Sequence, residues 1–463
     1  MSGATRTRTA QLVEGPIGPT LRRMTIPMVL GILAMVLFTL VDTFFISLLG
    51  TEPLAALGFT FPVTLVTTHL AMGLGVGTSA IVGRTLGADD AALARRQVTE
   101  SLLLALVVVG LLAAGGLLVM RPLFGLLGAG ADLMPLIRAY MVPWLLGVPL
   151  LVLTMVGNSA LRASGDTKTP AILMSGAGVL NAALDPLLIF GPGPFPALGL
   201  QGAALASVIS WVAALGASQY VLGVRQKLVE AAWPGLRPLL AAWRGHLRIS
   251  APAAGSNVMP PLANGVLTAL VARHGAEAVA GFGVGTRIEA LALVVALALS
   301  GSLSPFISQN FGAGRMDRVR EAYRLSARFL VLWELGIWVL LALAAPLLTA
   351  VFTDDPAVAA ALALFLWIRP AGYGLQAVLV ISSASLNALH RPFHAAGLGL
   401  IRLFVFYVPP AYAGALLYGV AGIFAGATLG NIVLGILAVR WMLARALPAS
   451  QPVEGQEGAQ ATR

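Results

Sequence analysis

Two aspartates, Asp42 and Asp185, lie within long apolar stretches of the chain, where a carboxylate needs a reason to be present. A charged side chain at the centre of a bilayer costs about 2.5–3.5 kcal/mol on insertion scales. Asp42 precedes Gly50 by eight residues and Asp185 precedes Gly191 by six, near the same end of their predicted helices. At about 1.5 Å per residue, their depths differ by one helical turn or less. The two acids are therefore predicted to share one level of the membrane.

Oxygen-bearing groups accompany the two acids. Asn181 lies four residues before Asp185 and shares its helix face. Pro27 and Pro186 can kink their helices and free backbone carbonyls. Such oxygens suit a proton or a sodium ion. The alternative is that each aspartate only caps or bonds a neighbouring helix. Because intramembrane ionisable groups are functional by default, we expect a site for a coupling cation.

Other ionisable groups inside the apolar stretches are secondary candidates. Glu289 and Arg287 are two residues apart, which puts their side chains on different faces of a helix, so they need not pair. Glu289 and Glu334 are expected to line a cavity in the second half or to reach an interface by tilt. Arg402 is expected to snorkel toward the cytoplasm, and His69 to be a bonded interior residue.

Methionine and aromatic side chains also fall within the apolar stretches. They form an adaptable lining for organic compounds or, alternatively, ordinary helix packing. The residues that we predict for a substrate cavity are Phe38, Met72, Tyr140, Met155 and Met174.

The composition is that of a polytopic membrane protein. Of 463 residues, 58% are hydrophobic and only 10% are charged, against about 25% charged in soluble domains. The apolar runs are too long and continuous for a β-barrel. We therefore predict an all-α fold of twelve transmembrane helices, each about 20 residues or more. The predicted spans are 25–49, 55–83, 97–120, 134–161, 169–191, 197–223, 247–272, 278–309, 322–346, 357–389, 394–418 and 420–444.

The distribution of basic residues predicts the orientation. With both termini in the cytoplasm, cytoplasmic loops and tails hold 23 of the 29 Lys and Arg residues, and the opposite side holds Arg121, Arg138, Arg273 and Arg369. The positive-inside rule favours that orientation, in the plasma (inner) membrane. It also accounts for the net charge of +10 without a nucleic-acid partner.

The chain divides into two six-helix halves. We predict an N-terminal bundle over residues 25–223 and a C-terminal bundle over 247–446, joined by a basic cytoplasmic linker, 224–246, that contains Trp233-Pro234-Gly235. Cytoplasmic tails are predicted over 1–24 and 447–463. Residues 1–20 and 448–463 are rich in small and polar residues, which favours disorder.

An internal repeat relates the halves. With a shift of 225 residues, Pro27 meets Pro252, Gly50 meets Gly275 and Gly87 meets Gly312; later, at a shift of 220, Gly199 meets Gly419. Because each half has six spans, both copies have one topology, and the pseudo-two-fold axis runs along the membrane normal. Two such V-shaped halves are expected to rock about a central cavity.

Motifs of catalysis are missing from the sequence. It contains no phosphate-binding loop, no His-Glu-x-x-His, no Gly-x-Ser-x-Gly and no cysteine. We therefore expect a protein that is not an enzyme and has no cofactor or resident metal. Any active transport would draw on an ion gradient.

Several segments resemble the multidrug and toxic compound extrusion (MATE) antiporters. They are IPMVLGILAMVLFTLVDTFFISLLGTEPLAALGF from residue 26, GRTLGADD, ALRASGDTKTPAI and NAALDPLLIFG. The resemblance spans nearly all of residues 20–446 and is strongest in the DNA-damage-inducible-protein-F branch. It implies export of organic, often cationic and amphipathic, compounds in exchange for protons or sodium.

The resemblance also implies site residues. In that branch the cation site lies in the N-terminal half, which here would be Asp42, Asn158, Asn181, Asp185 and Ser207, the last where a threonine is frequent. Tyr140 would join the cavity network, and Phe38 replaces a tyrosine of some relatives. The other main branch uses a glutamate in helix 7, where Pro260 falls in this chain.

Other functions fit the sequence less well. A flippase for lipids or lipid-linked glycans needs basic residues in its cavity, and only Arg287 and Arg402 are available. An intramembrane acyltransferase needs a nucleophile–histidine or metal constellation, which the five scattered histidines do not form, and duplicated halves give no reason for a passive channel. The expected partners are small organic substrates and membrane lipid, and we expect a monomer.

Overall fold

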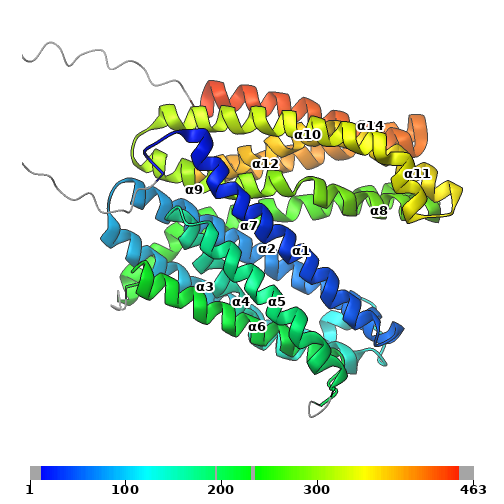
Figure 1. Cartoon of the computed structure of the whole chain (residues 1–463), viewed down its shortest axis with the longest axis horizontal. Helices are drawn as coiled ribbons and strands as arrows, with labels where there is room; N and C mark the ends of the chain where they lie inside the picture. Colours follow the sequence, from blue (N-terminus) through cyan, green and yellow to red (C-terminus); the bar gives the residue numbers. More distant parts are fainter. Residues whose placement is uncertain (1–11, 193–195, 231–234, 448–463) are drawn as a thin grey trace, which may run out of the picture.

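Two helical lobes make up the molecule. The computed structural model describes residues 12–192, 196–230 and 235–447. Figure 1 shows the lobes meeting at one end, called here the closed end, and diverging toward the other, the open end. The helices of the N-terminal lobe are α1 (Ile17–Ser47), α2 (Thr51–Gly87), α3 (Ala91–Leu126), α4 (Met134–Ala163), α5 (Lys168–Phe190) and α6 (Leu200–Tyr220).

The C-terminal lobe has more breaks in its helices. Its helices are α7 (Leu236–Ala272), α8 (Ala276–Ala292), α9 (Val294–Gly312), α10 (Met316–Phe352), α11 (Pro356–Ile368), α12 (Tyr373–Ala388), α13 (Pro392–Ile401) and α14 (Val408–Trp441). A 3₁₀ turn, Arg369–Gly372, joins α11 to α12, and π-helical turns cover Val221–Arg225, Arg402–Tyr407 and Met442–Ala446.

These helices confirm the predicted twelve-span, all-α fold. Nine helical stretches of the described chain are long and apolar enough to span a membrane, and α8 with α9, bent by 41°, makes a tenth. The stretch Pro392–Ala446 counts as one of the nine, but its backbone leaves the helical region at Tyr418 and Gly419. There it folds back, because Gly414 packs on Gly422 and Gly426 on Pro410. That hairpin adds an eleventh span, and α7 is the twelfth.

The repeat is visible in the backbone conformation. Gly50 and Gly275, which begin α2 and α8, have φ of 111° and 112°. Gly199 has φ 53° and ψ −132°, and its counterpart Gly419 has φ 57° and ψ −135°. These conformations are open to glycine and costly for other residues. The two halves therefore use glycine at equivalent turns because their chains turn in the same way.

Glycines join the lobes at the closed end. A Cβ atom on Gly87 of α2 would overlap the carbonyl oxygen of Gln309 in α9, and one on Gly312 of α9 would overlap the carbonyl oxygen of Arg84 in α2. Both members of each pair differ by the repeat shift, since 312 − 87 and 309 − 84 are both 225. The two contacts are thus related by the pseudo-two-fold axis, and small residues let the backbones touch.

The start of the chain differs from the expected cytoplasmic tail. Helix α1 begins at Ile17, within the region 1–24 predicted as a tail, and Leu12 is fully buried. Leu12 donates its backbone N–H to Gln309 Oε1 (3.1 Å), and its carbonyl accepts from Asn310 Nδ2 (3.1 Å). Leu12, Ile17 and Leu21 pack with the C-terminal lobe. The expectation of disorder is thus wrong for residues 12–20, while residues 1–11, Trp233, Pro234 and 448–463 lie outside the described residues.

We predict that Gly312→Ala separates the lobes at the closed end. The added methyl meets backbone atoms that cannot rotate away, so overpacking is expected to cost about 1–3 kcal/mol of stability. Because the chain has no cysteine, Ser308→Cys, buried against Gly83 between α2 and α9, reports separation through its labelling by a water-soluble maleimide.

Labelling should be faster in the Gly312→Ala background. Gly110→Ala, at an α3 glycine with open space around its Cβ position, is the control and should leave the rate unchanged. Equal labelling rates in the two backgrounds would show that this contact does not hold the lobes together.

Candidate functional site

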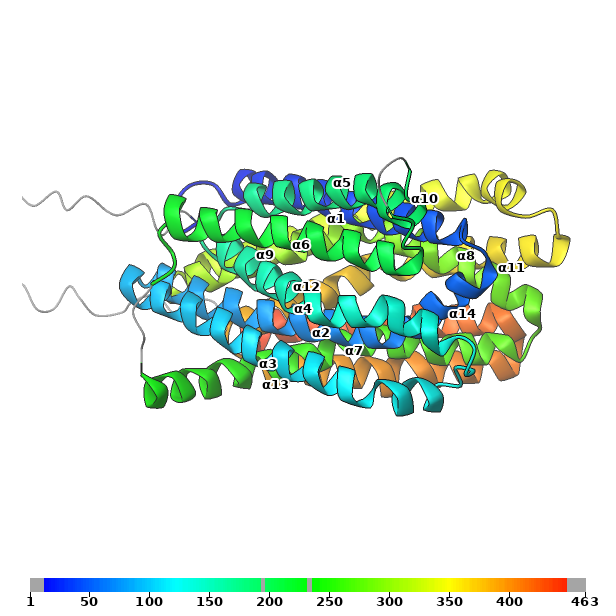
Figure 2. The same cartoon turned by 90° about the horizontal axis from the view of Figure 1, so that it is seen from below.

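Close packing of α1 on α5 positions the two aspartates. Figure 2 shows the two helices side by side along one edge of the molecule. A Cβ on Gly31 would lie 3.2 Å from Ala171, and one on Gly178 would overlap the Phe38 ring. Phe38 and Asp42 are four residues apart on α1, and Gly178 and Asp185 are seven apart on α5, so each pair shares a helix face. The ring seated on Gly178 therefore turns Asp42 toward Asp185.

The two carboxyl groups have unsatisfied oxygens. Asp185 is fully buried, and Asp42 is partly buried. The groups lie close enough to interact electrostatically. Asp42 Oδ1 and Asp185 Oδ2 are buried without a hydrogen-bond partner. Since a buried polar atom normally has a partner, this pair of acceptors is suited to receive a proton or a hard cation.

An amide and two hydroxyls complete this group. Asn181 Nδ2 makes long contacts with Asp185 Oδ1 (3.4 Å) and with Ser207 Oγ (3.3 Å) of α6. Tyr140 of α4 is buried and interacts electrostatically with both aspartates. Each of these residues lies five to seven positions from the open end of its helix, or about 8–11 Å along the axis. Four helices thus bring their polar side chains to one level, and we call this group the acidic cluster.

The C-terminal lobe contains a different polar group, buried and paired. Arg369 Nη2 lies 3.2 Å from Glu289 Oε2 and donates to Tyr407 Oη (3.0 Å). Gln376 Nε2 donates to Glu289 Oε1 (2.9 Å). Asn431 links Gln376 to Arg402, at 2.8 and 3.0 Å. These six residues, called the arginine network, come from α8, the turns Arg369–Gly372 and Arg402–Tyr407, α12 and α14.

The protein-family model that matches this chain is MatE. It matches twice, over residues 27–187 and 252–413. The chain belongs to the MATE family of transporters. The two matches begin 225 residues apart (252 − 27), which is the shift of the sequence repeat. In relatives and solved structures the whole length is covered: the chain is 43% identical over 425 residues to a FAD transporter of Shewanella oneidensis, which spans 92% of this chain and 94% of the relative.

More distant relatives of this MATE transporter carry drug-resistance names. The probable multidrug resistance protein NorM of Thermotoga maritima is 25% identical and covers 69% of each chain. The multidrug export protein MepA of Staphylococcus aureus is 26% identical and covers 68% of this chain and 69% of its own. Among solved structures, the Vibrio cholerae MATE transporter VcmN in the bent form has a TM-score of 0.86 at 33% identity, covering 93% of this chain and 96% of that one.

The acidic cluster of this MATE transporter contains most of the predicted cation-site residues. It brings Asp42, Asp185, Asn181 and Ser207 together, with Tyr140. It does not include Asn158, which lies five residues from the closed end of α4, whereas Asp185 lies 17 residues from the closed end of α5. The difference is about 18 Å along the helix axes. Asn158 is instead buried in the closed half of the lobe.

The predicted methionine lining is also separate from the acidic cluster. Met72, Met155 and Met174 lie in the closed-end halves of α2, α4 and α5. Met174, eleven residues before Asp185, is about 16 Å from its level. Met155 packs against the core of the N-terminal lobe, while Met72 is 43% exposed. Phe38 does lie next to the acidic cluster, through its contact with Gly178.

Arg369 and Arg402 correct two sequence predictions. Arg369, expected in a loop on the outer side, is only 2% exposed and neutralises Glu289. Arg402, expected to snorkel toward the cytoplasm, donates instead to Asn431 inside the lobe. Glu289 and Arg287 do not pair, as expected. Glu334 is fully buried against α12, with both carboxyl oxygens unpartnered.

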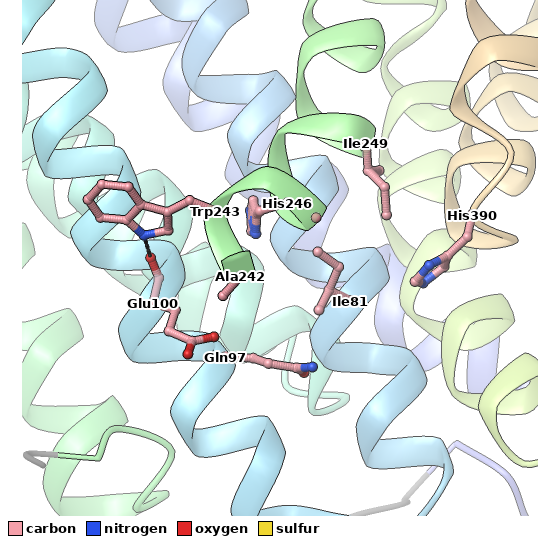
Figure 3. A pocket seen from close by; sticks show the side chains of 9 residues that line it. Ile81, Gln97, Glu100, Ala242, Trp243, His246, Ile249 and His390 are labelled. Carbon is pink, nitrogen blue, oxygen red and sulfur yellow. Dashed lines mark hydrogen bonds between the residues drawn. The ribbon is translucent and has the colours of Figure 1, made fainter. Parts of the chain in front are cut away.

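A cavity of about 270 Å³ lies at the closed end, away from all predicted site residues. Figure 3 shows His246 and Trp243 of α7 above Gln97 and Glu100 of α3, with His390 on the other side. Trp243 Nε1 donates to the Glu100 carbonyl (3.0 Å). Burial lowers the pKa of His390, so its ring is neutral at pH 7 and Nε2 can donate to the Ala80 carbonyl (3.2 Å).

We predict that Gly178→Ala disrupts the acidic cluster. Its methyl displaces the Phe38 ring and so moves Asp42 away from Asp185, which should impair transport and lower the unfolding temperature. Gly176→Ala is the control, because the same helix leaves that Cβ position open. The double variant Gly178→Ala with Phe38→Ala should recover part of the lost transport. Without any recovery, the ring contact would not be what positions the cluster.

We predict that Glu289→Gln destabilises the C-terminal lobe. Removing one member of a buried ion pair leaves the other charge uncompensated, at a cost of about 3–5 kcal/mol. The thermal unfolding midpoint in detergent measures the effect, with exposed Glu277 of the same helix as the Glu277→Gln control. Adding Arg369→Met should restore much of the stability, since it removes the orphaned charge; a further fall would contradict this account.

Proposed function

We propose that this MATE transporter exports organic compounds in exchange for a proton or sodium ion held by the acidic cluster. The observation that carries the proposal is the pair of buried, unpartnered oxygens on Asp42 and Asp185. Two carboxylates close together repel each other, and a cation or proton between them relieves that repulsion. The cluster therefore has a physical reason to take up a cation when water reaches it.

Alternation between two states would couple that cation to transport. A ligand can shift an equilibrium only by binding its two states unequally. Asp42 lies on α1, which also contacts the C-terminal lobe through Met28 and the residues around Leu21. Neutralising Asp42 therefore changes the energy of a helix that touches both lobes. With the termini in the cytoplasm, as the basic loops favour, the closed end is cytoplasmic and the structure is open outward.

The identity of the organic cargo has two candidates. Cationic, amphipathic drugs are the cargo that the multidrug names of several relatives suggest. Flavin nucleotide is the second, and the observation that favours it is the 43% identity to a FAD transporter along almost the whole chain, against 25–26% over about two thirds of the chain for those drug-resistance relatives. We propose flavin nucleotides as the first cargo to test.

Asp42→Asn should abolish cation-driven efflux. The amide cannot take up a proton or neutralise a sodium ion, so transport driven by an imposed gradient should fall more than tenfold while insertion into the membrane is retained. The measurement is uptake of FAD, and separately of a cationic dye, into everted vesicles with a pH gradient, with and without sodium.

Glu52→Gln, at an exposed carboxylate at the open end, is the matched control and should transport normally. If only sodium supports uptake, the coupling ion is sodium rather than the proton. Undiminished, gradient-driven efflux by Asp42→Asn would refute the role given to the acidic cluster.

A further inference from the structure

Arg287 is an exposed arginine in the middle of a transmembrane helix. It lies eleven residues from the open end of α8, or about 17 Å along the axis, and it is exposed. Among the described residues no carboxylate forms a salt bridge with it. Glu289, two residues later, points into the lobe and pairs with Arg369 instead. Arg287 is therefore a charge within the membrane that the protein itself leaves unneutralised.

The surroundings of Arg287 show that it faces water rather than lipid. A charged side chain at this depth faces a bundle interior or a water-filled cavity, because contact with lipid tails is too costly. Figure 1 shows α8 on the side of its lobe that faces the N-terminal lobe. Gly283, Arg287 and Leu291 share one exposed face of α8, and open space surrounds the Cβ position of Gly283. The guanidinium thus stands beside room for a flat organic group.

The arginine network behind Arg287 reinforces the positive charge of this wall. It holds two guanidinium groups, Arg369 and Arg402, against one carboxylate, Glu289. Arg369 Nε and Nη1 are buried without partners. The other lobe presents the acidic cluster, so the two lobes are oppositely charged. A guanidinium binds phosphate and carboxylate through a planar fork of donors, which makes it suited to anion recognition.

We propose that Arg287 binds the anionic group of the transported compound, a phosphate or carboxylate, and so selects anionic organic cargo. The inference rests on the proposed function of organic export and narrows its cargo. An aromatic or apolar part of the same compound would lie along α8, over Gly283 and Leu291. Cationic compounds would be disfavoured at this wall by repulsion.

Binding of two flavins that differ only in a phosphate tests the proposal. The purified full chain is reconstituted in phosphatidylcholine nanodiscs, and flavin fluorescence reports the affinity for FMN and for riboflavin without any ion gradient. Wild type should bind FMN more tightly. Arg287→Gln should weaken FMN binding about tenfold or more, as expected for a hydrogen bond to a charged group, and leave riboflavin unchanged. Arg287→Lys should be intermediate, because it keeps the charge but loses the fork.

Matched arms separate the alternatives. Arg273→Gln, at an exposed arginine of the same lobe that ends α7, should alter neither affinity. Wild type that fails to prefer FMN, or an Arg287→Gln variant that loses both flavins equally or neither, overturns the proposal. Added phosphatidylglycerol that abolishes FMN binding through Arg287 would identify a lipid headgroup as the occupant and overturn it too. Because no gradient is used, failure of cation coupling leaves this result independent.

Discussion

One constraint shapes the interior of this transporter: a membrane protein can hold a charge only where protein or water replaces the hydration that the charge has lost. Three arrangements meet it here in different ways. Glu289 is neutralised by Arg369, at 3.2 Å. Asp42 and Asp185 keep oxygens without partners, and Arg287 keeps its exposure to water. The first arrangement is complete in itself, whereas the other two leave room for a ligand of opposite charge.

Duplication supplied the scaffold but not these polar groups. In the register of the repeat, Asp42 corresponds to Leu267, which is fully buried in the C-terminal core. Glu289 corresponds to Thr64 and Arg369 to Trp144, so the N-terminal lobe has no counterpart of the ion pair. The glycine contacts between the lobes, by contrast, are kept in both copies. Shared backbone geometry preserved the packing between halves, while the two interiors acquired opposite charge.

The sequence allows much of this to be predicted because the bilayer imposes simple rules. Span length and apolar composition predicted the twelve helices, and glycine spacing predicted the repeat that the backbone angles of Gly50 and Gly275 reproduce. Depth counted along two helices was enough to group Asp42 with Asp185. Arg369 was misplaced because a 3₁₀ turn inside a span looks like a span end, and nothing in its composition shows that the chain continues straight into α12. Asn158 was misplaced because a resemblance assigns residues by type, whereas helix length decides the level at which each one lies.

The separation of the two charged walls decides how an exchanger of this design must work. A cation in the acidic cluster and an anion at Arg287 attract rather than compete, so direct displacement of one by the other cannot drive exchange. Coupling must then come from conformations that bind the two ligands unequally. The described contacts that both lobes share are at the closed end, where Gly87 and Gly312 meet backbone carbonyls and Leu12 is held by Gln309 and Asn310. Closing the open end requires these contacts to break, so their free energy sets the amount that cation binding on α1 has to overcome before cargo can change sides.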